Sequence, residues 1–179
     1  MWSVEYRRSG DKGGGWPGSY QDIKSAVAYL PKLGGYPVDL DKVAIAGHSA
    51  GGHLALLAGA DKLVDFSAVI GLAAIVDLEQ YSQGSNSCQT ATSKFMGGSV
   101  DEVPQAYHKA NPAKRQLHDL TVLLHGTKDS IVPIDHAKAS SARQKLIHGA
   151  GHFDMIHPGT QSFQTLLQEL AKAFATKGA

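Results

Sequence analysis

A serine between two glycines is the first group in this chain that could do chemistry. Ser49 lies at the centre of a Gly-x-Ser-x-Gly motif at residues 47–51, which follows the short apolar run 43–46 and precedes the helix-forming segment 50–60. A strand before the motif and a helix after it are the context in which this motif holds a nucleophilic serine above a sheet. Glycine on both sides of the turn is expected to let strand and helix approach closely. The amide of Ala50, at the start of the helix, would then point toward an oxyanion that forms at the serine.

A serine hydroxyl needs a base to take its proton, and the base needs an acid to orient it. In sheets of this type the acid and then the histidine follow the serine along the chain. Asp129 comes just after the apolar run 120–126, and His152 lies on a glycine-flanked loop after the run 145–148. We therefore predict a catalytic triad in which Ser49 attacks, His152 acts as base and then as acid, and Asp129 orients the imidazole.

Other residues compete for the roles of acid and base. Asp129 could be an ordinary turn residue after a strand, and Asp135 is a second candidate acid, although its place at a helix start favours an interaction with the helix dipole. His125 follows an apolar strand and has the pattern of a buried structural histidine. His48 and His53 flank the motif and are expected to pack there or to line a pocket. No His-Glu-x-x-His or Cys-x-x-Cys spacing occurs, so neither a metal nor another cofactor is predicted.

Length and composition predict one globular domain over residues 1–179. Hydrophobic residues make up 42% of the 179-residue chain and charged residues 18%, a balance that excludes a disordered polymer. The net charge is +1 and no run of Lys or Arg is dense, so no nucleic-acid partner is expected. No apolar run has the length of a membrane span, and the first residues lack the apolar region of a signal peptide. The single cysteine, Cys88, is interpreted as an incidental thiol, and together these features predict a cytoplasmic protein.

The expected elements alternate between strands and helices. Strands are predicted at 3–7, 41–46, 66–72, 120–126 and 145–148. Helices are predicted at 20–30, 50–60, 133–143 and 160–175, with a short one inside 100–108. Ser19 with Asp22 is expected to cap the first of these helices, and Asp101 the short one. The alternation indicates an α/β fold, a mostly parallel sheet of about five strands with helices on both faces, with the polar stretch 79–110 as a small cap or loop.

The chain resembles the α/β-hydrolase superfamily, and within it the hormone-sensitive-lipase-like, arylformamidase-like and acetyl-xylan or feruloyl esterases. Three stretches in the expected order carry the resemblance, namely 47–55, 124–133 and 149–154. Two stretches near the start of the chain, 6–8 and 13–17, support it. The resemblance implies a reduced α/β-hydrolase fold that lacks the family's first strands. It also implies a carboxylesterase that cleaves short-chain or aryl esters of small molecules through an acyl-enzyme on Ser49. Arylformamidase-type amide hydrolysis would use the same triad and stays open as an alternative.

One departure from the family concerns the oxyanion hole. The His-Gly-Gly loop that supplies the family's second backbone donor does not occur here, and the chain is expected to begin at the family's fourth strand. Removing one oxyanion donor lowers the rate about 100- to 1000-fold. We hypothesise that strand 3–7 pairs with 43–46 and that amides of the next loop replace the missing donor. The candidate donors are the amides of Gly13, Gly14 and Gly15. The alternative is that this loop only turns the chain, with Trp16 packed on the core.

The shortness of the 79–110 segment predicts an open pocket that favours small acyl groups. The candidate wall residues are His48, Trp16 and Phe153, with Tyr81, Phe95 and Met96 as further aromatic or apolar candidates. A sheet without its first strands would expose an edge, so we expect a homo-oligomer that pairs through the N-terminal sheet edge. A different class also stays open, namely a catalytically weak remnant that serves as a binding or assembly module.

Overall fold

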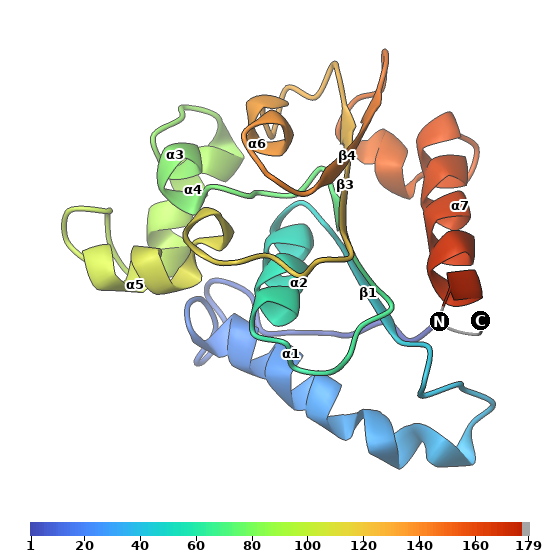
Figure 1. Cartoon of the computed structure of the whole chain (residues 1–179). Helices are drawn as coiled ribbons and strands as arrows, with labels where there is room; N and C mark the ends of the chain where they lie inside the picture. Colours follow the sequence, from blue (N-terminus) through green and yellow to red (C-terminus); the bar gives the residue numbers. More distant parts are fainter. Residues whose placement is uncertain (177–179) are drawn as a thin grey trace.

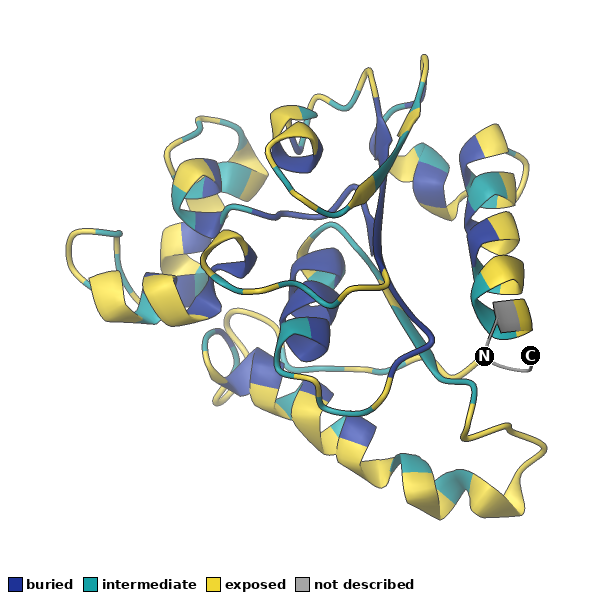
Figure 2. Ribbon diagram, in the orientation of Figure 1, coloured by how far each residue is buried: buried dark blue, intermediate teal, exposed yellow. Residues whose placement is uncertain are grey.

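The computed structural model describes residues 1–176 and contains one parallel four-stranded sheet. The strands β1 (Ala44–His48), β2 (Ala68–Leu72), β3 (Thr121–Gly126) and β4 (Arg143–Ile147) pair side by side in chain order. Figure 1 shows the sheet nearly edge-on, with β1, β3 and β4 labelled. Every residue of β2 and β3 is buried, because these two strands are paired on both sides and covered on both faces (Figure 2). The expected parallel α/β fold is confirmed.

Helices cover the two faces of the sheet, and alternate side chains of the central strands point to opposite faces. Val69 packs into a core with α1 (Gly18–Tyr29) and α2 (Ala50–Ala60). Ile70, the next residue of β2, packs into a second core with α7 (Gln161–Thr176) on the other face. The continuous apolar runs in the sequence therefore reflect strands that are buried on both faces.

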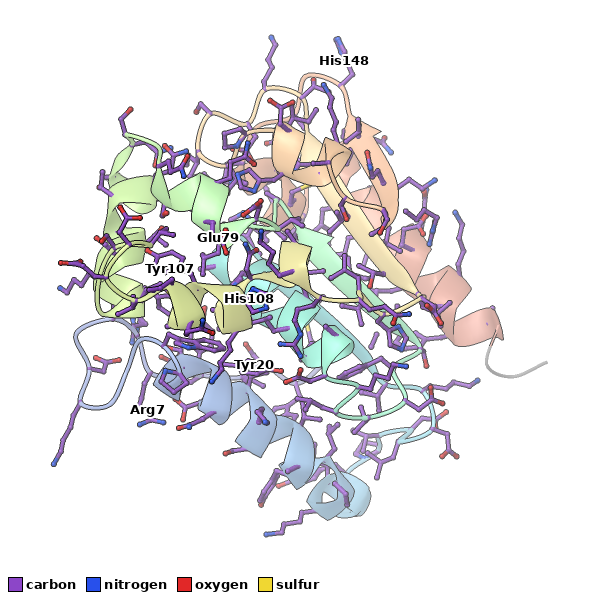
Figure 3. All side chains as sticks on the ribbon, turned by 60° about the vertical axis from the view of Figure 1, so that its left-hand side comes forward. Arg7, Tyr20, Glu79, Tyr107, His108 and His148 are labelled. Carbon is purple, nitrogen blue, oxygen red and sulfur yellow. The ribbon has the colours of Figure 1, made fainter. Side chains whose placement is uncertain are left out.

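The segment 3–7 is not a strand, so the sheet has four strands rather than about five. The backbone amide of Arg7 donates to the Asp22 carboxylate on α1 over 2.9 Å, and the Arg7 guanidinium binds the same carboxylate. The ion pair between Arg7 and Asp22 holds the segment against α1. Arg7 is labelled in Figure 3. Tyr6 packs into the core beneath α2. The hypothesis that 3–7 pairs with 43–46 is therefore wrong, and β1 is one of the two edge strands of the sheet.

The ends of several helices differ from the expectation. No side chain caps α1, because the Ser19 hydroxyl donates to the Arg7 carbonyl and Asp22 is bound by Arg7. The helix expected from 133 to 143 is only the short α6 (Asp135–Lys138), since β4 already begins at Arg143. The helix inside 100–108 is α5 (Pro104–Ala110), whose N-cap is Val103 rather than Asp101.

The stretch 79–110 is more helical than a loop. It contains α3 (Leu78–Ser82), α4 (Ser87–Met96) and α5, which lie together beside the sheet in Figure 1. Their buried side chains, among them Tyr81, Met96 and Tyr107, form a third core cluster. The remaining elements are short 3₁₀ helices: η1 (Leu30–Gly35), η2 (Pro112–Lys114) and η3 (Phe153–Ile156). Within residues 1–176, no helix combines the length and apolarity needed to cross a membrane, and no cluster of side chains could hold a metal ion.

Candidate active site

The turn between β1 and α2 holds Ser49 in a strained backbone conformation. Ser49 has φ 55° and ψ −117°, a region that residues with a Cβ rarely adopt. A Cβ on Gly47 would stand 2.1 Å from the Gly51 carbonyl oxygen, so position 47 requires glycine. The motif suggested that Gly51 is the second position that requires glycine, but the structure has this constraint at Gly52. A Cβ on Gly52 would stand 2.6 Å from the Ala74 Cβ. This packing fixes the turn that presents the serine.

The surroundings of Ser49 leave its hydroxyl free. Its backbone amide donates to the Leu72 carbonyl over 2.8 Å, which ties the turn to β2. The hydroxyl makes no hydrogen bond to any residue in the described part of the chain, and the residue is half-buried. Ala50 is the first residue of α2, so its amide has no partner within the helix and can serve an anion.

Asp129 and His152 form a buried pair beyond the carboxyl ends of β3 and β4. His152 Nδ1 donates to Asp129 Oδ2 over 2.8 Å, and the two side chains are 5% and 0% exposed. Asp129 Oδ1 accepts two further bonds, from the amides of Ile131 and Val132, each at 2.9 Å. Because Asp129 holds Nδ1, the other ring nitrogen, Nε2, is the one available for proton transfer.

The charge of Asp129 is stabilised strongly enough to overcome its burial. Burial raises the pKa of this carboxyl, but the nearby His125 ring, the hydrogen bond from His152 and those from two backbone amides outweigh it and hold the pKa well below its ordinary value. His125 Nε2 lies 3.4 Å from Asp129 Oδ2 and donates to the Val132 carbonyl over 2.9 Å. Asp129 is therefore an anion at neutral pH, the form that orients a histidine base.

His48 links the serine turn to the loop of His152. His48 Nε2 donates to the His152 carbonyl over 2.9 Å, and the two rings lie 4.5 Å apart between centroids. Burial lowers the pKa of His48, so this ring is neutral at pH 7. The residue beside Ser49 thus contacts His152 directly. The structure contains no hydrogen bond between Ser49 and His152 themselves, and such bonds often tighten only when substrate binds.

The other predicted pocket residues have different surroundings. Phe153 is 62% exposed, with its ring 5.7 Å from that of His48 and 5.1 Å from that of His152. Trp16 stacks on Tyr20 at 5.8 Å and packs against two core clusters. Two pockets in the structure, of about 390 and 260 Å³, are lined by neither Ser49 nor His152.

Three amides at the glycine-rich loop already have hydrogen-bond partners. Gly14 donates to the Asp11 carbonyl over 2.9 Å, and Gly15 donates to the Ser19 hydroxyl over 3.1 Å. Trp16 donates to the Phe95 carbonyl over 2.7 Å, which fastens the loop to α4. An oxyanion role for this loop stays a prediction, and for Gly14 and Gly15 it would require these bonds to open.

Sequence reasoning missed two contacts at the site. The first is the approach of His125 to Asp129, although the four-residue spacing between them was a signal that could have suggested it. The second is the Tyr6 hydroxyl, which lies 3.7 Å from where a Cβ on Gly51 would stand. No motif connects residue 6 with residue 51, so only the fold reveals this approach. The buried His53 has a structural role instead, since it contacts the Ala110 carbonyl and burial lowers its pKa to about 4.

A parallel sheet covered by helices, with a serine at a sharp strand–helix turn, defines the α/β-hydrolase class. The chain belongs to the BD-FAE family, whose model matches residues 1–144. It is 27% identical over 175 residues to Esterase LipC of Mycobacterium tuberculosis, covering 79% of this chain and 42% of that protein.

Solved structures of esterases share the fold. Esterase B from Lactobacillus rhamnosis matches with a TM-score of 0.75 at 20% identity, over 97% of this chain and 64% of that one. A truncated carbohydrate esterase from gut microbiota matches with a TM-score of 0.74 at 22% identity, over 97% of this chain and 73% of that one. The chain thus spans about two-fifths of the curated esterase and about two-thirds of these structures.

Proposed function

We propose that this chain is a serine carboxylesterase that cleaves esters of small molecules. The observation that carries the proposal is the buried Asp129–His152 pair, joined through His48 to a serine in a strained strand–helix turn. Buried carboxylate–histidine pairs of this kind orient a general base. The relationship to esterases of the same family supports the choice of reaction.

The proposed mechanism has two halves. His152 Nε2 removes the Ser49 proton as Oγ attacks the ester carbonyl, and the Ala50 amide stabilises the oxyanion. His152 then gives that proton to the departing alcohol, which leaves an acyl group on Ser49. Water attacks the acyl-enzyme with His152 again as base, and the acid is released when the proton returns to Ser49. Asp129 stays ionised and stabilises the imidazolium in both halves.

We expect the site to favour a small acyl group, because the segment 79–110 is too short to enclose a long chain. The exposed Phe153 ring beside His152 offers an apolar contact for a short acyl or an aryl group.

Short-chain ester hydrolysis by purified variants tests this proposal. Wild type is expected to hydrolyse p-nitrophenyl acetate and to be labelled by a fluorophosphonate, and Ser49→Ala is expected to lose both. Ser25→Ala, which alters an exposed serine on α1, is the matched control and should behave as wild type. A wild type that neither turns over the ester nor becomes labelled would contradict the proposal and favour a binding or assembly module.

We also propose that the chain forms a homo-oligomer through the free edge of β1. Val43 accepts a bond from Ser67 and the Ser49 amide donates to Leu72, so alternate backbone groups of β1 point toward β2. The backbone groups of Ala44 and Ala46 therefore point to the opposite edge, where no described strand pairs with them. Free strand edges of this kind favour pairing with another strand.

A further inference from the structure

The Tyr6 side chain reaches the start of α2 from an extended segment outside the sheet. Its ring packs into the core cluster that contains residues of α1 and α2. Its hydroxyl lies 3.7 Å from where a Cβ on Gly51 would stand, which places it against the first turn of α2. Gly51 directly follows Ala50, whose amide is the first donor of the proposed oxyanion hole.

The Tyr6 hydroxyl has no hydrogen-bond partner within the described residues. The three buried tyrosines each have one: Tyr20 binds Asp61 at 2.7 Å, Tyr81 binds the Ile131 carbonyl at 3.3 Å and Tyr107 binds the Gly98 carbonyl at 3.3 Å. A partly buried phenol usually finds a partner, because desolvating it without one is unfavourable. A hydroxyl kept free beside helix amides is available to a ligand that accepts hydrogen bonds.

Two features keep this hydroxyl in place as a donor. Arg7, the next residue, is anchored to Asp22 through its backbone amide and its guanidinium, so the backbone that carries Tyr6 is fixed to α1 (Figure 3). Burial raises the pKa of Tyr6, so the phenol keeps its proton at the pH values at which a histidine base works.

We propose that the Tyr6 hydroxyl is the second donor of the oxyanion hole, acting with the Ala50 amide on the negative oxygen that forms when Ser49 attacks. The candidate amides of Gly14 and Gly15 already donate elsewhere, whereas the phenol is free. The hydroxyl donates a hydrogen bond and keeps its proton, so no further group is consumed. This assignment rests on the proposed esterase function and names a catalytic residue for it.

Tyr6→Phe removes only the hydroxyl and tests the assignment. We expect kcat for p-nitrophenyl acetate to fall on the order of 100-fold, with KM changed less than about threefold, because the oxyanion exists only in the transition state and intermediate. The rate of fluorophosphonate labelling should fall in parallel. The melting temperature should stay at the wild-type value, since the hydroxyl has no partner to lose.

Tyr20→Phe is the matched control. It removes a hydroxyl from a neighbouring tyrosine that binds Asp61, so its melting temperature should fall while kcat stays unchanged. Full kcat in Tyr6→Phe, with Ser49→Ala inactive, would overturn the oxyanion assignment alone. The assignment would also be overturned if Tyr6→Phe and Tyr20→Phe lost kcat equally and had the same loss of melting temperature. Absence of Ser49-dependent hydrolysis in wild type would overturn the proposed function, and this assignment with it.

Discussion

The buried carboxylate of Asp129 orients both the loop after β3 and the ring of His152. Its two oxygens receive bonds from His152, Ile131 and Val132, and His125 approaches the same carboxylate. The backbone bonds fix the rotamer of Asp129, and the rotamer in turn fixes the ring of His152. The carboxylate is therefore both a structural centre for the loop after β3 and the group that selects the tautomer of the proposed base.

Asp129→Asn is expected to lower kcat about 1,000- to 10,000-fold with little change in KM. The amide can still accept from the backbone, but its NH2 group faces His152 Nδ1 and favours the tautomer that cannot take the serine proton. Steady-state hydrolysis of p-nitrophenyl acetate measures this change. Asp135→Asn is the matched control, since Asp135 is exposed at the start of α6. If Asp135→Asn lost activity and Asp129→Asn did not, the acid would be misassigned.

The residues of the proposed triad could be predicted because motif order and strand ends are local properties of the sequence. Ser49 and Asp129 each follow an apolar run, and His152 follows the short strand-like stretch 145–148; such stretches mark strands whose carboxyl ends share one rim. Tyr6 could not be found in this way. Its approach to Gly51 depends on the path of a segment that is anchored by one ion pair to α1, and nothing in the local pattern indicates that path.

At the scale of elements, α7 and β4 are joined by a buried carboxylate. The side chain of Glu169 is 2% exposed, and three cations surround it: Arg143 at 2.6 Å, Lys172 at 3.1 Å and Lys145 at 3.9 Å. Burial raises the pKa of Glu169, but the contacts with Arg143 and Lys172 outweigh it, so the net pKa is lowered. The ionised form therefore stabilises the folded state above the ordinary pKa of a glutamate, and this contribution is lost as the pH falls through the lowered value.

Glu169→Gln is expected to lower the free energy of unfolding by about 1–3 kcal/mol at pH 7, because the cations lose their counter-charge while the side chain stays buried. The difference from wild type should shrink as the pH falls below about 4. Urea unfolding at neutral and at acidic pH measures this difference in the free energy of unfolding. Glu79→Gln, which removes a more exposed partner of Lys114, should change stability by less than about 1 kcal/mol. A constant difference across pH would contradict the electrostatic explanation.

Buried elements were predictable and surface elements were not. β2 and β3 read as continuous apolar runs because both of their faces are covered. The segment 3–7 has strand-like residues, yet the Arg7 amide is taken by a side chain instead of a neighbouring strand. In 79–110 the helices α3–α5 are short and outwardly polar, so their periodicity is weak; the Asn86–Gln89 capping box was the one strong local signal.

At the scale of the whole molecule, β1 is one of the two edge strands of the sheet, and no described strand pairs with its outer side. If the proposed oligomer forms there, light scattering at micromolar concentration should give a mass of at least two chains. Ala46→Pro should shift the mass to that of one chain, because it removes a donor that faces the free edge and leaves the bonds to β2 intact. Ala46→Ser is the control and should keep the wild-type mass. A monomeric wild type would rule out the edge-paired assembly.

Because of the backbone conformation of Ser49, a single substitution at this position is expected to raise the stability of the whole chain and to abolish its proposed activity. Glycine would adopt φ 55° and ψ −117° without strain, and the serine hydroxyl has no hydrogen bond to lose within residues 1–176. Ser49→Gly should therefore raise the free energy of unfolding by about 1 kcal/mol or more while it abolishes hydrolysis. In a library of variants selected for folding alone, glycine at this position would outcompete the parent. If the same library were selected for growth on an ester, the variant with glycine at this position would be lost.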